Sequence, residues 1–122
     1  MDSKELAQIC AQLADSKKAE NIVILDMREV STIADFFVIA SGVADPHLRA
    51  IADQVQDEVK RQHKISPRAT EGGMNAAWIV LDYFDVIVHI MREDTRERFD
   101  LEGLWGDAER TEITDAKAVN AD

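Results

Sequence analysis

Apolar side chains recur along the chain with two different periods, which predicts that helices and strands alternate. Over residues 3–17 the apolar positions are spaced by three and four residues, as on the buried face of a helix. The same spacing returns over residues 46–63, with Asp45 as the expected N-cap residue and Pro46 in the first turn. A third helical segment is expected over residues 93–106.

Four short runs rich in branched and aromatic apolar residues predict buried strands at residues 21–26, 36–41, 76–82 and 85–91. Only a tight turn separates the last two runs, so they are expected to form an antiparallel hairpin. The pattern also allows a short strand near residues 68–71. This order of elements indicates one α/β domain with a mixed β-sheet flanked by helices.

The end of the chain differs in composition from the rest. Residues 107–122 contain five acidic and two basic residues and few large apolar ones. Such a segment has little to bury, so it is expected to stay mobile. We therefore predict a folded domain at residues 1–106 and an acidic tail at residues 107–122.

Charge narrows the classes of partner. The 122-residue chain has 24 Asp and Glu residues against 14 Lys and Arg residues, a formal charge of -10. Because binding to nucleic-acid phosphates needs clustered Lys and Arg, a direct grip on nucleic acid is not expected, whereas a basic protein is a suitable partner. The apolar runs are shorter than the ~20 residues that cross a bilayer, and Cys10 stands alone. These features favour a cytoplasmic protein that does not bind a membrane.

Catalytic and metal-binding patterns are missing from the sequence. The glycines have neither the P-loop nor the dinucleotide-binding spacing. His47, His63 and His89 lie in different predicted elements, so a metal site is not expected. Asp82 and Asp85 flank one tight turn, where Asp is favoured for its bonds to the backbone. The sequence therefore predicts no catalytic residues, no metal ligands and no cofactor.

Trp78 is the most informative single residue. Alternation along its strand places Trp78 and Asp82 on one face, and alternation along the next strand places His89 and Met91 together. Pairing of the two strands would join these faces into one mixed patch, with Tyr83 beside it. Two interpretations stay open: Trp78 anchors an interface, or it is an ordinary tryptophan packed on the sheet.

Several short motifs, taken in order, resemble the ribosomal silencing factor family (RsfS, or Iojap-like). The motifs are Asp35–Gly42, Ile51–Asp53, Glu71–Gly72, Ala77–Asp82, Asp85–His89, Arg96 and Leu101–Trp105. Each is weak alone, but their order and spacing are specific, and they cover about residues 5–106. The resemblance does not extend to the acidic tail.

The resemblance implies a fold related to nucleotidyltransferases but without their paired-aspartate metal signature. It implies a translation regulator that is not an enzyme, that binds ribosomal protein L-fourteen of the large subunit, and that blocks joining of the small subunit when nutrients are short. It also implies a homodimer when the protein is free. The alternative is a nucleotidyltransferase-like enzyme or nucleotide-binding protein. The expected partner-binding residues are Glu71, Trp78, Asp82, Tyr83, His89, Met91, Glu102 and Trp105.

Overall fold

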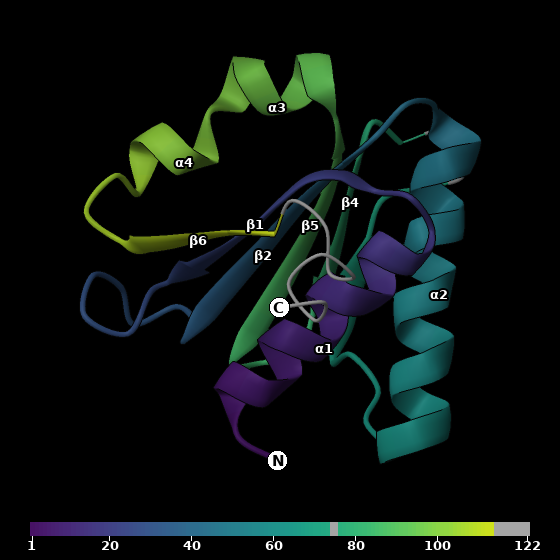
Figure 1. Cartoon of the computed structure of the whole chain (residues 1–122), viewed down its shortest axis with the longest axis horizontal. Helices are drawn as coiled ribbons and strands as arrows, with labels where there is room; N and C mark the ends of the chain where they lie inside the picture. Colours follow the sequence, from purple (N-terminus) through teal and green to yellow (C-terminus); the bar gives the residue numbers. More distant parts are fainter. Residues whose placement is uncertain (74–75, 114–122) are drawn as a thin grey trace, which may run out of the picture.

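Six strands form one mixed sheet, and helices cover both of its faces (Figure 1). The computed structural model describes residues 1–73 and 76–113. In chain order the elements are α1 (Ser3–Ser16), β1 (Glu20–Asp26), β2 (Phe36–Gly42), α2 (Asp45–His63), β3 (Ala69–Glu71), β4 (Trp78–Asp82), β5 (Val86–Arg92), α3 (Glu93–Phe99), α4 (Leu101–Leu104) and β6 (Glu109–Ile113). The predicted α/β domain with a mixed sheet is confirmed.

The strands are arranged in the order β3-β4-β5-β2-β1-β6. The central pair, β2 and β5, is parallel, and the other four pairs are antiparallel. The predicted hairpin is therefore confirmed as β4 and β5, and the short strand allowed near residues 68–71 is β3. The order of the strands places β4, β5 and β2 side by side, and these three carry the candidate site described below.

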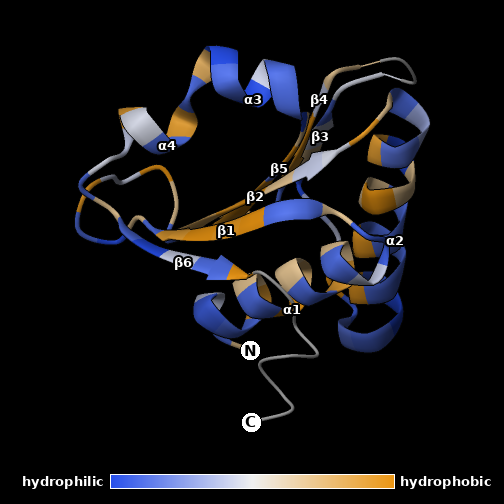
Figure 2. Ribbon diagram, turned by 45° about the horizontal axis from the view of Figure 1, so that its top comes forward, coloured by the Kyte–Doolittle hydropathy of each residue, from blue (hydrophilic) through white to orange (hydrophobic). Residues whose placement is uncertain are grey.

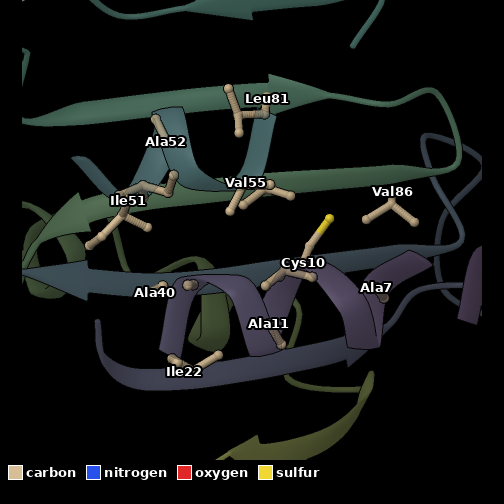
Figure 3. Close-up of a cluster of buried hydrophobic side chains, with 14 of the residues drawn as sticks. Ala7, Cys10, Ala11, Ile22, Ala40, Ile51, Ala52, Val55, Leu81 and Val86 are labelled. Atoms are coloured by element: carbon tan, nitrogen blue, oxygen red, sulfur yellow. The ribbon is translucent and has the colours of Figure 1, made fainter. Parts of the chain in front are cut away.

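The larger apolar core lies between the sheet and the helices α1 and α2. Figure 3 shows part of it, with Ala7, Cys10 and Ala11 from α1, Ile51, Ala52 and Val55 from α2, and Ile22, Ala40, Leu81 and Val86 from the strands. Helix α2 buries the stripe that its periodicity predicts, whereas α1 buries Leu6 and Cys10 of its predicted stripe and leaves Ile9 and Leu13 partly buried. The start of α1 also follows its sequence, because Asp2 Oδ1 accepts a hydrogen bond from the Glu5 backbone N–H at 2.8 Å.

The second apolar cluster occupies the opposite face of the sheet. Its buried members include Val23, Leu25, Phe37, Ile39 and Met91. The short helices α3 and α4 lie over this face, on the other side of the sheet from α1 and α2 (Figure 2). They cover it less completely, because the β4 side chains on this face are only half-buried, whereas those on the opposite face are buried. This uneven cover distinguishes the two faces and locates the candidate site.

Three details of the predicted elements are wrong. Ala44 is the N-cap residue of α2, and Asp45 instead pairs with Arg92 at 3.4 Å. The predicted helix over residues 93–106 is two helices, because Asp100 adopts a left-handed backbone conformation with φ 44° between them. Such a residue ends an α-helix, since it turns the chain away from the helix axis.

The third correction concerns the end of the chain. Residues Glu109–Ile113 form the edge strand β6, paired antiparallel with β1, so the predicted mobile tail is wrong for them. Four of the five residues are exposed, and no apolar alternation signals a strand. The backbone of β1 supplies the hydrogen-bonding partners that make this segment extended. The remainder of the predicted tail, residues 114–122, lies outside the described residues.

Among the described residues, no helix has both the length and the apolar composition that crossing a membrane requires.

Candidate functional site

Five aromatic rings form a continuous row across the second face of the sheet. The row runs from Trp105 through Phe37, His89 and Trp78 to Phe99. Successive ring centroids are 6.2, 4.8, 5.8 and 5.1 Å apart, within the range of interacting aromatic pairs. We call these five residues the aromatic row. It joins β2, β4 and β5 to the segment that carries α3 and α4.

The two ends of the aromatic row reach the surface, while its middle is buried. Phe99 is 51% exposed, and Trp78 and Trp105 are half-buried. Phe37 and His89 are buried beneath them. Leu104, at the end of α4, is 70% exposed next to Trp105 in the chain. A partner that covers these ends would therefore meet apolar and aromatic side chains on a sheet that already holds them in place.

Trp78 has features of both interpretations, the interface anchor and the tryptophan packed on the sheet. One side of its ring packs on the second apolar cluster, and its tilted stacking with Phe99 places the two rings 5.1 Å apart. The indole Nε1–H donates a hydrogen bond to His89 Nδ1 at 3.1 Å. Trp78 is therefore a half-buried side chain with a fixed orientation, which is the state expected of an interface anchor before its partner binds.

His89 and Met91 lie on the face predicted for them but are buried. The register pairs Trp78 with Met91 and Val80 with His89, so the predicted joining of the two strand faces is confirmed. Met91 is fully buried and His89 is 7% exposed, so neither presents a surface to a partner. Their prediction as direct contacts is therefore wrong in this structure. Their role is to support Trp78 from below.

Burial also determines the protonation state of His89. Loss of solvent lowers the pKa of His89 to about 4, so the ring is neutral near pH 7. Because Nδ1 accepts the indole hydrogen bond, the proton is assigned to Nε2. Nε2 has no hydrogen-bond partner within the part of the chain that the structure describes. A neutral ring is thus required for the bond that orients Trp78.

Tyr83 does not belong to the site. It is buried in the first core, on the side of α1 and α2, opposite the aromatic row. Burial raises the pKa of its phenol above the usual value. The alternation that places Ile79 and Leu81 on that side continues to Tyr83 through the turn, so the strand pattern itself predicts this position. The expectation that Tyr83 lies beside Trp78 is wrong.

Asp82 and Glu71 lie at the β3–β4 edge of the sheet. Asp82 Oδ1 accepts the backbone N–H of Phe84 at 2.8 Å, and Oδ2 lies 3.1 Å from Arg68 Nε. The carboxylate therefore stabilises the hairpin turn, as its position in the sequence indicates. Glu71 is exposed on β3, opposite Val80 of β4. The charge of Asp82 is partly neutralised by Arg68, whereas the carboxylate of Glu71 is exposed to solvent.

Glu102 lies at the other side of the site, on α4. Its Oε1 accepts a hydrogen bond from Arg96 Nε at 2.8 Å, and its Oε2 lies 3.1 Å from Arg110 Nη1. The hydrogen bond from Arg96 lowers the pKa of Glu102, and the charges of both arginines lower it further. The Glu102 carboxylate is therefore ionised, and it forms ion pairs with both Arg96 and Arg110. Trp105, one turn later, contacts Phe37 edge to face.

Four residues that form or support the site, Phe37, Phe99, Leu104 and Arg96, are not among the partner-binding residues expected from the sequence. Phe99 and Leu104 are predicted as apolar members of one continuous helix, which would bury them together. The break at Asp100 instead leaves both exposed. Arg96 is 5% exposed, a rare position for a guanidinium, and no pattern of neighbouring residues signals its burial.

The arrangement suits binding to another protein. Within residues 1–73 and 76–113, no group of three His, Cys, Asp or Glu side chains is placed to hold a metal ion. Burial raises the pKa of Cys10 to about 12, so this thiol is protonated and unreactive near neutral pH. The aromatic row offers exposed rings with charged residues around them, which is the composition of a protein-binding surface.

Comparison with known proteins agrees with the family resemblance found in the sequence motifs. The family model described as "Ribosomal silencing factor during starvation" matches residues 1–122. Ribosomal silencing factor RsfS of Halalkalibacterium halodurans is 39% identical over 113 residues, which cover 93% of this chain and 96% of that protein. RsfS of Bacillus subtilis is also 39% identical, over 88% of this chain and 91% of that protein. A crystal structure of a Chromobacterium violaceum protein, 25% identical, superimposes with a TM-score of 0.83 over 95% of this chain and 96% of the other.

Proposed function

Because the chain belongs to the ribosomal silencing factor (RsfS) family, we propose that it binds the large ribosomal subunit and prevents the small subunit from joining it. Members of this family are ribosome-binding regulators and not enzymes. The proposed partner on the subunit is ribosomal protein L-fourteen, and the proposed outcome is repression of translation when nutrients are limiting. The cytoplasm, where subunits join, is the proposed location.

The observation that carries this proposal is the aromatic row with its two open ends. Trp78 is half-buried and stacked on the exposed Phe99, and Trp105 and the exposed Leu104 end the other side. Interfaces are commonly built around aromatic anchors that lie at the centre of an apolar patch. The partly buried hydrogen bond from Trp78 to His89 holds the anchor in one orientation, which reduces the entropy lost on binding.

Steric exclusion is a sufficient mechanism. If this face covers the surface of the large subunit that contacts the small subunit, the two subunits cannot join while the protein is bound. No nucleotide, metal ion or covalent step is needed. By mass action, the block holds only while the concentration of the protein exceeds its dissociation constant for the large subunit. The level of the protein then controls the fraction of silenced subunits.

The first prediction is that the purified protein sediments with the large subunit and lowers the 70S monosome peak. Large and small subunits are mixed with increasing protein and separated on sucrose gradients. An acidic protein of similar size serves as the control for non-specific charge effects. An unchanged monosome peak at saturating protein, with the protein absent from the large-subunit fractions, contradicts the proposal.

The second prediction is that association with the large subunit slows as salt rises, while dissociation changes much less. The chain carries a net charge of -10, and the Debye length falls from ~10 Å at 0.1 M to ~3 Å at 1 M ionic strength. Attraction between an acidic protein and a basic partner acts mainly on the association rate. Rates are measured by stopped-flow at several salt concentrations.

Two variants test whether the dependence on salt arises from charges near the candidate site. Glu71→Gln removes an exposed charge from the edge of the candidate site, and Asp57→Asn removes an exposed charge from α2, on the other side of the sheet. Glu71→Gln should slow association at low salt, and Asp57→Asn should have a smaller effect. Association rates that do not respond to salt in any of the three proteins show that the charge serves solubility alone.

Two narrower parts of the proposal rest on the family resemblance. One is that the free protein forms a homodimer. The other is that its mixed sheet is related to nucleotidyltransferase folds. Neither is needed for the steric mechanism.

A further inference from the structure

The segment that carries α3 and α4 has few apolar attachments of its own. Both helices are short, and all their residues are described. Within α3 the only buried residue is Arg96, and within α4 no residue is fully buried. A helix normally stays on a sheet because it buries an apolar stripe. Something else must therefore keep this segment in place.

Arg96 connects the segment directly to β2 and, through Glu102 of α4, to the edge strand β6. Its Nη1 donates a hydrogen bond to Ser41 Oγ in β2 at 2.8 Å, and its Nε donates to Glu102 Oε1 in α4 at 2.8 Å. Glu102 also pairs with Arg110 of the edge strand β6, and Arg110 Nη2 lies 3.0 Å from Glu112 Oε1. We call Ser41, Arg96, Glu102 and Arg110 the Arg96 network.

The network determines where part of the aromatic row lies. Glu102 belongs to the same single helical turn as Leu101 and Leu104, and Trp105 is the C-cap residue of that turn. Leu101 and Trp105 pack on the second apolar cluster, where Trp105 contacts Phe37. Holding Glu102 in place therefore also holds Trp105 on the sheet face.

We propose that Arg96 is a positioning residue: it holds α4 against the sheet and thereby completes the surface on which the ribosomal partner docks. The docking part rests on the proposed function, whereas the positioning of α4 does not. A planar guanidinium can donate to Ser41 and to Glu102 at the same time. A lysine ammonium has a single nitrogen and cannot reproduce this fork between two elements.

Part of the Arg96 network lines a cavity. This cavity of about 450 Å³ is lined by Asn21, Arg96, Glu97, Glu102, Arg110 and Glu112. The cavity is also lined by Ile22, Val23 and Ile113, but the polar contacts that join α4 to β6 and, through Arg96, to β2 lie on this side. Removing the guanidinium still leaves Glu102 paired with Arg110, so no carboxylate is buried without a partner. We therefore expect a local release of α4 and not loss of the whole fold.

The test compares Arg96→Met with a matched control, Arg61→Met. Arg61 also donates two hydrogen bonds to a glutamate, Glu58, but this pair is exposed on α2. Amide exchange detected by NMR is measured at Leu104 and Trp105, whose N–H groups bond within α4, and at Ile39 and Val88 in the central strands. Affinity for the large subunit is measured on the same proteins.

In Arg96→Met we expect exchange at Leu104 and Trp105 to rise at least roughly tenfold, with exchange at Ile39 and Val88 nearly unchanged, because local opening is separate from global unfolding. Affinity for the large subunit should fall by about tenfold or more. Arg61→Met should change neither quantity. Arg96→Lys should lie between Arg96→Met and the wild type, and it replaces Arg96→Met in every comparison if that variant does not fold.

Three results would overturn the proposal. The first is exchange in α4 that equals the Arg61→Met control. The second is acceleration of all amides together, which would mean that the segment is not held separately from the core. The third is faster exchange in α4 with unchanged affinity, which would mean that α4 is not part of the docking surface. If the wild type itself does not bind large subunits, the proposed function fails, while the exchange measurement still decides the positioning of α4.

Discussion

Replacing Trp78 with alanine is expected to weaken binding to the large ribosomal subunit at least roughly thirtyfold, which corresponds to ~2 kcal/mol. The indole stacks on Phe99 with centroids 5.1 Å apart and donates its N–H to His89. Truncation removes the half-buried ring between His89 and Phe99 in the aromatic row and leaves Phe99 without its stacking partner. The measurement is a titration of labelled large subunits with the wild type and the variant.

The same substitution also tests the interpretation of Trp78 as a core residue. A fully buried tryptophan changed to alanine destabilises a protein by ~3–5 kcal/mol. Trp78 is only half-buried, so its loss should lower the free energy of unfolding by less than this range. Chemical denaturation of the variant gives this value. A loss of stability in the full core range with normal affinity of the folded fraction would contradict the role of Trp78 as an anchor.

Two further variants test which part of the effect comes from the indole N–H and whether it is specific to the aromatic row. Trp78→Phe keeps an aromatic ring but removes the donor to His89, so it should lose part of the affinity. Phe84→Ala removes an exposed aromatic ring from the turn between β4 and β5, away from the aromatic row, and should leave affinity unchanged. Equal losses in Trp78→Ala and Phe84→Ala would show that the effect does not arise from the aromatic row.

Acid is expected to destabilise the protein before its carboxylates are protonated. The pKa of His89 is about 4 in the folded state, against 6.5 for an ordinary histidine. Between these values the unfolded chain binds a proton that the folded chain does not, so the free energy of unfolding falls as the pH falls. The stabilisation is complete above pH 6.5 and is lost as the pH approaches 4. The expected total is about 3 kcal/mol.

The measurement is the free energy of unfolding by denaturant at several pH values between 4 and 7. His89→Asn is the informative variant, because its amide oxygen can accept the indole N–H and the side chain does not titrate. It should flatten the dependence on pH in this range. His63→Asn, at the end of α2 and away from the aromatic row, is the control and should keep the slope of the wild type. The same slope in the wild type and in His89→Asn would contradict the assignment.

Protonation of His89 also links stability to the candidate site. A proton on Nδ1 would remove the acceptor that orients Trp78, so the indole should become more mobile at low pH. Trp78 fluorescence in a Trp105→Phe background would follow this change. The buried position of His89 thus makes the anchor rigid near neutral pH, where Nδ1 is free to accept.

Elements that bury a regular apolar pattern could be predicted from the amino-acid sequence. The stripes of α1 and α2 and the alternation along β4 and β5 identify which side chains share a face, because a side chain's direction follows from the period of its element. That reasoning correctly grouped Trp78 with His89 and Met91. The same alternation, continued through the turn, predicts that Tyr83 lies on the same face as Leu81. The order and spacing of short motifs were enough to identify the family.

Features that depend on neighbours distant in sequence could be established only from the folded chain. The strand β6 has no apolar pattern and exists because β1 offers it an edge, and the burial of Arg96 depends on Ser41, 55 residues earlier in the chain. The cover over Trp78 includes Phe99 of α3, whose ring centroid lies 5.1 Å from that of the indole although the two residues are far apart in the sequence. Local periodicity predicts the direction in which a side chain points. The burial and the pKa of that side chain depend on the residues that the rest of the chain packs against it.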